Sequence, residues 1–305
     1  MKTEICKEKY AASMTAMPAS SEGQNRTLKS DLSRHELTLD QCYVLIREEQ
    51  VVARAVIDRK RSYIGALTME AIEQEAAYDF VKEIVDHLDD NMEWRVDLYS
   101  DKTNYALVYR ALKRWFPLEF KRESYTARTF KQDIASYEFV PAAQLAKEEL
   151  LELMVSASKT TLDLYLQREH VDMGLYPSLQ KLMEELLQDV ESGSLFQVLL
   201  IDHCPAGFIC VNRLLEEVGG IGYIGAHPKY QGSRLSSVLL QKALDMAWHH
   251  DIHKLIGDID VHNFAIRENL LRCGFTLDCR QSLFLLEKHQ QGIAHGKQLK
   301  TNDRD

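Results

Sequence analysis

The fold of this chain is decided by the stretch GGIGYIGAHPKYQGSRLSSVLL, residues 219–240. It opens with small and β-branched residues, passes Pro228 and a turn-rich segment at Gly232, and continues with apolar residues at helical spacing. This order predicts a strand, a tight loop and a helix. The first backbone N–H groups of such a helix are free and lie at the positive end of its dipole, where an anion such as a pyrophosphate binds well. Taken alone, the pattern is more often an ordinary strand-to-helix connection.

The segments that follow extend this pattern. HKLIGDIDVHN predicts a strand at 253–261, NFAIRENLLRCGF predicts a short helix at 263–275, and residues 281–287 predict a last strand. The order of elements resembles the GNAT superfamily of acyl-CoA acyltransferases over residues 137–288. The resemblance implies an α/β (α+β) fold, in which a mixed, mostly antiparallel central sheet is flanked by helices.

Short motifs carry the resemblance further. In the family, a strand ends in a hydrophobic–x–Pro segment, and a loop of the form Gln/Arg-x-x-Gly-x-Gly/Ala binds the coenzyme A pyrophosphate. Here the strand ends in AHP at 226–228, the loop reads QGSRLS at 231–236, and the family's Asn and terminal Gly-Phe are matched by Asn263 and GF at 274–275. The resemblance implies acetyl-CoA as co-substrate. It implies coenzyme contacts at Ile224, Ala226, Gln231, Gly232, Ser233, Arg234, Leu235, Ser236 and Asn263.

Three positions depart from the family pattern. Arg234 stands where the family usually has Gly, and Ser236 where it has Gly or Ala. Main-chain amides bind phosphate without those side chains, and Arg234 could add a charge to the site. Leu270 stands where the family often has a general-acid Tyr. Leucine cannot donate a proton, so the proton donor is left open.

Length, charge and cysteines limit the class of protein. A chain of 305 residues favours two domains over one. A net charge of −9 disfavours nucleic acid and anionic membranes as partners and suits a cationic acceptor. The six cysteines form no CxxC pair, so no metal site is expected. No apolar run reaches the length of a membrane span, and the N-terminus lacks the apolar core of a signal peptide, so we expect a cytoplasmic protein, as monomer or homodimer.

An internal repeat appears when the two halves are compared. YIGA at 63–66 recurs at 223–226, and NYA at 104–106 is matched by NFA at 263–265. Each match lies at the same place in the predicted order of elements, because strands are predicted at 42–46, 51–57, 62–69 and 93–99, and helices at 70–88 and 104–116. The sequence therefore predicts a tandem repeat of one fold.

The two copies differ where the coenzyme would bind. After the first YIGA, the segment LTMEAIEQEAAYDF at 67–80 has neither a glycine nor a basic residue, and Glu70, Glu73 and Glu75 would repel a pyrophosphate. We therefore predict a degenerate first copy without a coenzyme site at 31–133, which supports the second, coenzyme-binding copy at 134–290. The flanking residues 1–30 and 291–305 are predicted to be disordered, the first of them in part.

The residues that could act in proton transfer are less clear. Asp258 and Asp260 alternate along the predicted strand 253–261, so both side chains point to one face, and either could accept a proton or hold an ammonium. His227 has a suitable ordinary pKa for a base. Each also has a simpler explanation, a solvated strand edge for the two carboxylates and a solvated loop for His227. Asn263 could equally be an N-cap.

Helical spacing predicts helices at 146–158 and 178–191, and the resemblance implies that the segment between them, 160–177, covers the acceptor site. The leading hypothesis is an acetyl-CoA-dependent N-acetyltransferase for a primary amine of a small, cationic molecule, an antibiotic among the possibilities. Acetylation of a protein N-terminus or lysine is an alternative, and so is an acyl-CoA-binding sensor or scaffold without turnover.

Overall fold

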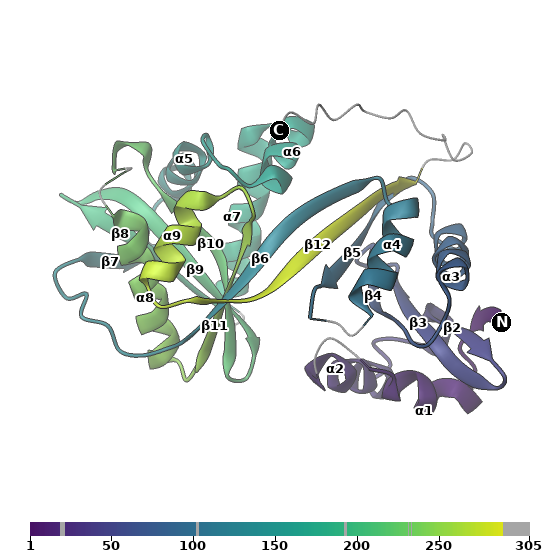
Figure 1. The fold of residues 1–305 in the computed structure, drawn as a ribbon. Helices are drawn as coiled ribbons and strands as arrows, with labels where there is room; N and C mark the ends of the chain where they lie inside the picture. The colour runs from purple at the N-terminus through teal and green to yellow at the C-terminus, as the bar shows by residue number, and fades with distance from the viewer. Residues whose placement is uncertain (19–21, 102–103, 192–193, 231, 233, 289–305) are drawn as a thin grey trace. The chain divides into compact units, whose positions relative to one another are not determined.

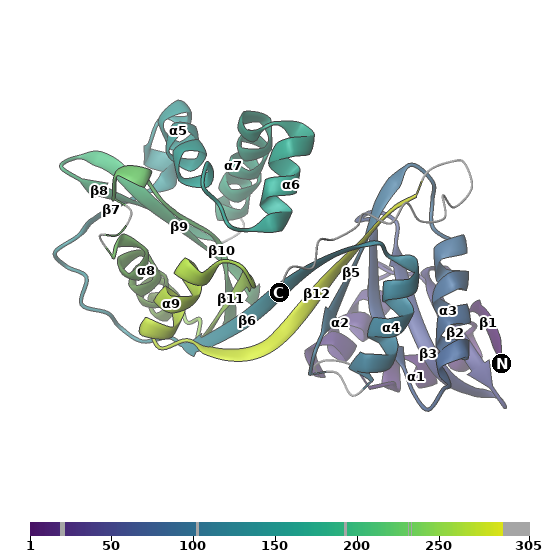
Figure 2. The same ribbon diagram turned by 45° about the horizontal axis from the view of Figure 1, so that its top comes forward.

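The computed structural model describes residues 1–18, 22–101, 104–191, 194–230, 232 and 234–288 (Figures 1 and 2). The chain forms two compact units. Unit 1 contains Met1–Glu119 and the segment from Gln281 onward, and unit 2 contains Phe120–Arg280. In each unit, helices cover a central sheet.

Unit 1 is built from short amphipathic helices and a largely antiparallel sheet. Strand order in its sheet is β1-β2-β3-β4-β5-β12, and only β4 and β5 run parallel. In chain order its elements are β1 (Lys2–Ile5), α1 (Glu8–Ala16), α2 (Glu22–Ser33), β2 (Cys42–Arg47), β3 (Gln50–Asp58), β4 (Tyr63–Met69), α3 (Gln74–Asp86), β5 (Met92–Tyr99), α4 (Tyr105–Trp115) and the second half of β12 (Thr276–Lys288).

Unit 2 has the same plan. Its sheet has the order β6-β11-β10-β9-β8-β7, and only β10 and β11 run parallel. Its elements are β6 (Leu118–Arg128), β7 (Glu138–Pro141), α5 (Lys147–Ser158), α6 (Leu164–Met173), α7 (Leu175–Glu191), β8 (Leu195–Ile201), β9 (Cys204–Leu215), β10 (Val218–Ala226), α8 (Leu235–His249), β11 (Lys254–Asp260) and α9 (Phe264–Arg272). The mixed, mostly antiparallel α/β fold predicted from the sequence is confirmed.

The order of elements repeats between the halves of the chain. From β1 to β6 it reads strand, two helices, three strands, helix, strand, helix, strand. From β7 to β12 it reads the same, except that three helices, α5 to α7, stand between the first two strands. The strand pairings repeat as well, including the one parallel pair in each unit. The tandem arrangement predicted from two short matches therefore extends through the whole element order.

The ends of the two copies are exchanged, which the sequence did not indicate. β6 follows α4 in the chain but pairs with β11 in unit 2, from Arg128 opposite Lys254 to Arg122 opposite Asp260. The second half of β12 pairs with β5 in unit 1. The predicted boundary at residues 133 and 134 therefore differs from the compact units, which divide at Glu119 and Arg280. The order of strands along the chain does not indicate whether the last strand of a copy pairs within its own copy or with the other copy.

The N-terminal segment is also more ordered than predicted. Residues 1–30, expected to be partly disordered, contain β1, α1 and most of α2. Tyr10 and Met14, four residues apart on one face of α1, are buried with Leu28 of α2 and Val44 of β2. Helical spacing of a few apolar residues outweighs a polar composition here, since those residues reach an existing sheet. The tail 291–305 lies outside the described residues.

Candidate functional site

The feature that creates a site in unit 2 is the divergence of two parallel strands. β10 pairs with β11 at Val218, Gly219 and Gly220, whereas from Ile221 to Ala226 its pairing within the described chain is with β9. The divergence starts at a bulge, because Gly222 is an extra residue between Ile221 and Tyr223 opposite β9. A bulge bends its strand and increases its twist. The β11-facing edge of β10 therefore leaves backbone groups without a strand partner.

A cavity of about 990 Å³ opens at this divergence. Its walls come from β6, β10, β11 and α5 to α9, all of them in unit 2. One end is formed by the residues before and at the start of α8, including Gly232, Arg234 and Ser236. The other walls come from the end of α5, from α6 and from α7. A space of this size could take a drug-sized ligand.

The start of α8 lies behind an open glycine. Gly232 has a φ of 83°, and nothing lies within 4 Å of the place where a Cβ would stand. The N–H groups of Ser237 and Val238 bond to the carbonyl of Arg234, so the N–H groups ahead of them lie before the first intrahelical bonds. Such N–H groups at a helix start bind phosphates.

Arg234 itself is held in an unfavourable backbone conformation. Its φ is 62°, in the left-handed region that glycine adopts without penalty. This explains why the family pattern has Gly at the position. A non-glycine residue held there costs on the order of 1 kcal/mol or more. Arg234 is one of the residues that line the cavity at the start of α8.

The predicted coenzyme contacts are brought together in one wall. Those that line the cavity are Ile224, Ala226, Gly232, Arg234, Leu235, Ser236 and Asn263. Gln231 and Ser233 lie outside the described residues. Asn263 has a second role, because its Oδ1 accepts the N–H of Ile266 at 3.3 Å and so caps α9.

The predicted proton-transfer residues are not brought together. Asp258 is exposed and lines the cavity. Asp260 is 1% exposed, and its carboxylate accepts the N–H of Leu164 at 3.2 Å and that of His262 at 2.8 Å. Asp260 thus fixes the loop before α6 to the turn after β11. His227 accepts the N–H of Lys229 on Nδ1 at 3.2 Å and is not among the cavity-lining residues described.

Two further groups line the cavity: Glu169, which the sequence did not indicate, and Tyr223, for which the sequence favoured packing over a role as an acid. Glu169 of α6 is half-buried, and burial raises the pKa of its carboxyl against an opposing hydrogen bond from Tyr165. Tyr223 of β10 has its Oη 2.6 Å from Oγ of Ser158 at the end of α5. Burial raises the pKa of Tyr223 more than the hydrogen bond to Ser158 lowers it. The net shift is therefore upward, and the phenol is protonated at neutral pH.

The sequence held a signal for the helix that carries Glu169. Asp163 accepts the N–H groups of Tyr165 and Leu166 at 3.0 and 3.1 Å and is the N-cap of α6. Asp ahead of a helical run is a start signal. This signal was not used in the sequence analysis. Residues 160–177 were expected only as a segment that covers the acceptor site, and the helix α6 within them was missed.

Leu270 lies where the resemblance places the family's acid. It is 1% exposed, and its Cδ2 would lie 3.3 Å from a Cβ built on Gly257 of β11. Its side chain therefore fills the floor of the cavity between β11 and α9 and supplies no proton.

The diverging strands, the cavity and the start of α8 thus lie together in unit 2. Residues 162–275 match the model of the acetyltransferase (GNAT) family, so this segment is a GNAT domain. Members of the family are acyltransferases that use acyl-CoA. A comparison with curated protein sequences finds no match.

Solved structures show the same fold over both units. A GNAT-family acetyltransferase from Colwellia psychrerythraea aligns with 94% of this chain and 100% of its own, with a TM-score of 0.54 and 10% identity. A tandem GNAT protein from the clavulanic acid biosynthesis pathway aligns with 93% of this chain and 95% of its own, with a TM-score of 0.53 and 11% identity. A GCN5-related N-acetyltransferase from Sphaerobacter thermophilus aligns with 86% of this chain and 85% of its own, with a TM-score of 0.52 and 12% identity.

The described residues show neither a metal site nor a membrane-spanning helix. They contain no group of three His, Cys, Asp or Glu side chains placed to hold a metal ion. Among the described helices, none combines the length and the apolar character that crossing a membrane requires.

Proposed function

We propose that unit 2 is an acetyl-CoA-dependent N-acetyltransferase that acts on a primary amine of a small molecule, with a cationic antibiotic as one possible acceptor. The observation that carries the proposal is the cavity between β10 and β11, which ends at the free N–H groups of α8 inside a GNAT domain. A small-molecule partner, rather than nucleic acid or membrane, is consistent with the net charge of −9.

The anion-binding end of the cavity would hold the pyrophosphate of the coenzyme. Gly232 lets the backbone approach closely, the first turn of α8 supplies N–H donors, and Arg234 supplies a positive charge. The unpaired edge of β10 would then run along the pantetheine. A main-chain N–H on that edge would polarise the thioester carbonyl.

In the reaction, the amine nitrogen attacks the thioester carbonyl carbon, the new C–N bond replaces the C–S bond, and coenzyme A leaves as a thiolate. The attacking ammonium must first lose a proton. Asp258 is the predicted base that lies in the cavity wall, whereas the carboxylate of Asp260 is occupied by backbone donors. His227 remains a candidate only if the loop that carries it moves.

A direct test measures thiol release from acetyl-CoA in the presence of amines, with product masses determined by mass spectrometry. Calorimetry with acetyl-CoA measures binding separately. Arg234→Gly keeps the left-handed backbone available and removes the charge, so acetyl-CoA should bind about 10-fold more weakly while the protein keeps its melting temperature or gains in it. Unchanged affinity would argue against a coenzyme phosphate at this loop.

A binding protein without turnover is the second candidate. Leu270, buried in place of a proton-donating tyrosine, is the observation that favours it. Acetyl-CoA binding without thiol release from any small amine, peptide N-terminus or lysine peptide would support it. Release with the peptides alone would instead indicate a protein acetyltransferase.

A further inference from the structure

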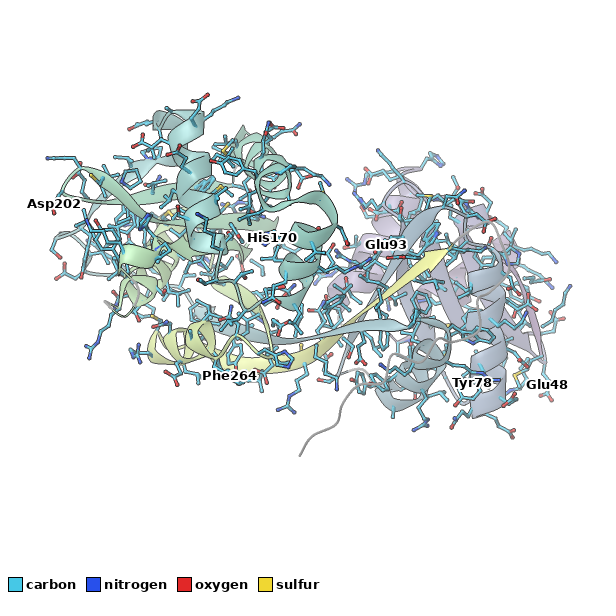
Figure 3. The ribbon with its side chains drawn as sticks, turned by 90° about the horizontal axis from the view of Figure 1, so that it is seen from above. Glu48, Tyr78, Glu93, His170, Asp202 and Phe264 are labelled. Carbon is cyan, nitrogen blue, oxygen red and sulfur yellow. The ribbon has the colours of Figure 1, made fainter. Side chains whose placement is uncertain are left out.

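The helix α6 forms part of the cavity wall. It is one of three helices between the first two strands of the second copy, where the first copy has two. Leu166, Glu169 and Met173 of α6 line the cavity, next to Leu182 of α7. Figure 3 labels His170, the neighbour of Glu169 on this helix. This part of the cavity wall therefore lies in the segment where the second copy has one helix more than the first.

Much of this wall is apolar and open. Leu162, just before α6, is 43% exposed, and Met173, at its end, is 46% exposed, although both line the cavity. Leu166 and Leu182 lie between them in the same wall and are half-buried. Exposed apolar side chains gathered in a cavity wall indicate a ligand with an apolar part.

The charges of the wall are mostly balanced within it. Asp163 accepts two backbone N–H groups and lies 3.4 Å from a guanidinium nitrogen of Arg122. Glu185 has Lys181 at 3.9 Å. These carboxylates already have cationic partners, so they offer little to an additional ammonium group.

Glu169 is the cavity-lining carboxylate within α6 itself, and Lys181 of α7 also acts on its charge. It is half-buried, and burial is the main cause that raises the pKa of its carboxyl. The groups that face it are Asp163 and Tyr165 on α6 and Lys181 and Glu185 on α7. An ammonium beside Glu169 would offset the cost of burying its charge.

We infer that the acceptor is a primary amine with one ammonium group and an apolar body, whose ammonium binds Glu169 and whose body lies against Leu166 and Met173. This inference rests on the proposed acetyltransferase function and narrows it. A polycation such as an aminoglycoside would have to place polar, charged groups against the apolar side chains of Leu162, Leu166 and Met173, which give an ammonium no hydrogen-bond acceptor. Glu169 acts here as a binding residue and not as the base.

The test uses the full chain, acetyl-CoA and four acceptors: 2-phenylethylamine, spermidine, kanamycin and a short peptide with a free Met-Leu N-terminus. We expect kcat/KM for 2-phenylethylamine to exceed that for spermidine and kanamycin at least about 10-fold. Glu169→Gln should raise KM for 2-phenylethylamine about 10-fold, with little change in kcat and none in acetyl-CoA affinity. Glu184→Gln is the matched control, because Glu184 is an exposed residue of α7 outside the cavity wall.

The pH profile gives a second readout. As pH falls through the raised pKa of Glu169, its carboxylate becomes protonated and loses its negative charge. KM for 2-phenylethylamine should therefore begin to rise at a higher pH than it would if the binding carboxylate belonged to an exposed Glu. This rise should be absent in Glu169→Gln. Met173→Ser should reduce the preference for 2-phenylethylamine over methylamine.

The outcomes separate this inference from the proposed function. Faster turnover of spermidine, kanamycin or the peptide, or an unchanged KM in Glu169→Gln, overturns the amine class while leaving the acetyltransferase in place. Absence of acetyl-CoA binding, measured calorimetrically, overturns the proposed function and the inference with it.

Discussion

In unit 1 the open edge of β4 is occupied by the unit's own side chains, whereas in unit 2 the open edge of β10 faces a cavity. The described pairing of β4 with β5 is at Tyr63 and Arg95, so these strands diverge as β10 and β11 do. The carbonyl of Met69 at the end of β4 accepts a hydrogen bond from the side chain of Asn104, which follows β5 in the chain. The divergence is thus a property of the fold, and what occupies it decides whether a ligand can enter.

The helix starts differ in the same direction. α3 begins after Glu73 and has Glu75 in its first turn, whereas α8 begins after Arg234 and has no acidic residue there. Negative side chains at a helix N-terminus interact with the positive end of the helix dipole themselves. Where the helix start has no negative side chain, the positive end of the dipole can interact with an external anion. We therefore expect one acetyl-CoA site per chain, in unit 2.

The largest effect is expected for Gly232→Asp. A carboxylate at this open position would face the pyrophosphate and should weaken acetyl-CoA binding at least about 100-fold, while circular dichroism shows a folded chain. Gly232→Asn has nearly the same size and backbone strain without the charge, and should keep measurable binding in calorimetry. Wild-type affinity in Gly232→Asp, or a second site per chain, would contradict the assignment of the site to unit 2.

The next effect concerns the exchanged strand. A chain that ends at Arg280 lacks the half of β12 that pairs with β5, together with Phe284, which is fully buried in the unit 1 core. Hydrogen exchange measured by mass spectrometry should show loss of protection in β5. A chain that ends at Lys288 is the control and should retain protection. Equal protection in both chains would show that β12 is not needed for unit 1.

A smaller loss of stability is expected for Arg54→Met. Arg54 is fully buried and donates to Met14 O and Asn25 Oδ1, both at 2.6 Å, as well as to Ala66 O. Removal of the guanidinium leaves these acceptors buried without their donor, at a cost of about 2–4 kcal/mol, and the melting temperature should fall by roughly 5–10 °C. An unchanged melting transition would mean that this network does not stabilise unit 1.

The same comparison shows what the sequence could predict. Strands and helices with clear periodicity were placed within a few residues. The turn at Gly232 was also placed correctly, because glycine-containing turns leave a short local pattern, whereas its role in phosphate binding stays a prediction. Arg54 was not selected, because the residues of α1 and α2 that bury it lie far from it in the sequence. Glu169 was not selected either, because its environment depends on α7 and no local sequence pattern indicates that packing. The exchange of β6 and β12 was missed for a similar reason.

A moderate effect is expected for the proton acceptor. If Asp258 takes the proton from the ammonium, Asp258→Asn should lower kcat about 10-fold or more at neutral pH and flatten the rise of rate with pH. Asp260→Asn tests the alternative and should mainly lower stability, because Asp260 accepts two backbone N–H groups. A pH profile that keeps its slope in Asp258→Asn would exclude this residue as the base.

The smallest effect is expected at the position of the missing acid. Leu270 packs against Gly257, so a tyrosine there must displace neighbours before its hydroxyl could reach a leaving thiolate. A thiol with an ordinary pKa of about 8.5 leaves tolerably near neutral pH, so the reaction depends mainly on positioning and on the state of the amine. Leu270→Tyr and the size-matched Leu270→Phe should therefore change kcat by similar amounts, within about threefold of each other. A gain found only with tyrosine would show that proton donation limits the rate. A limb of the pH profile removed by Tyr223→Phe would show instead that the phenol bonded to Ser158 has taken over the role of the acid.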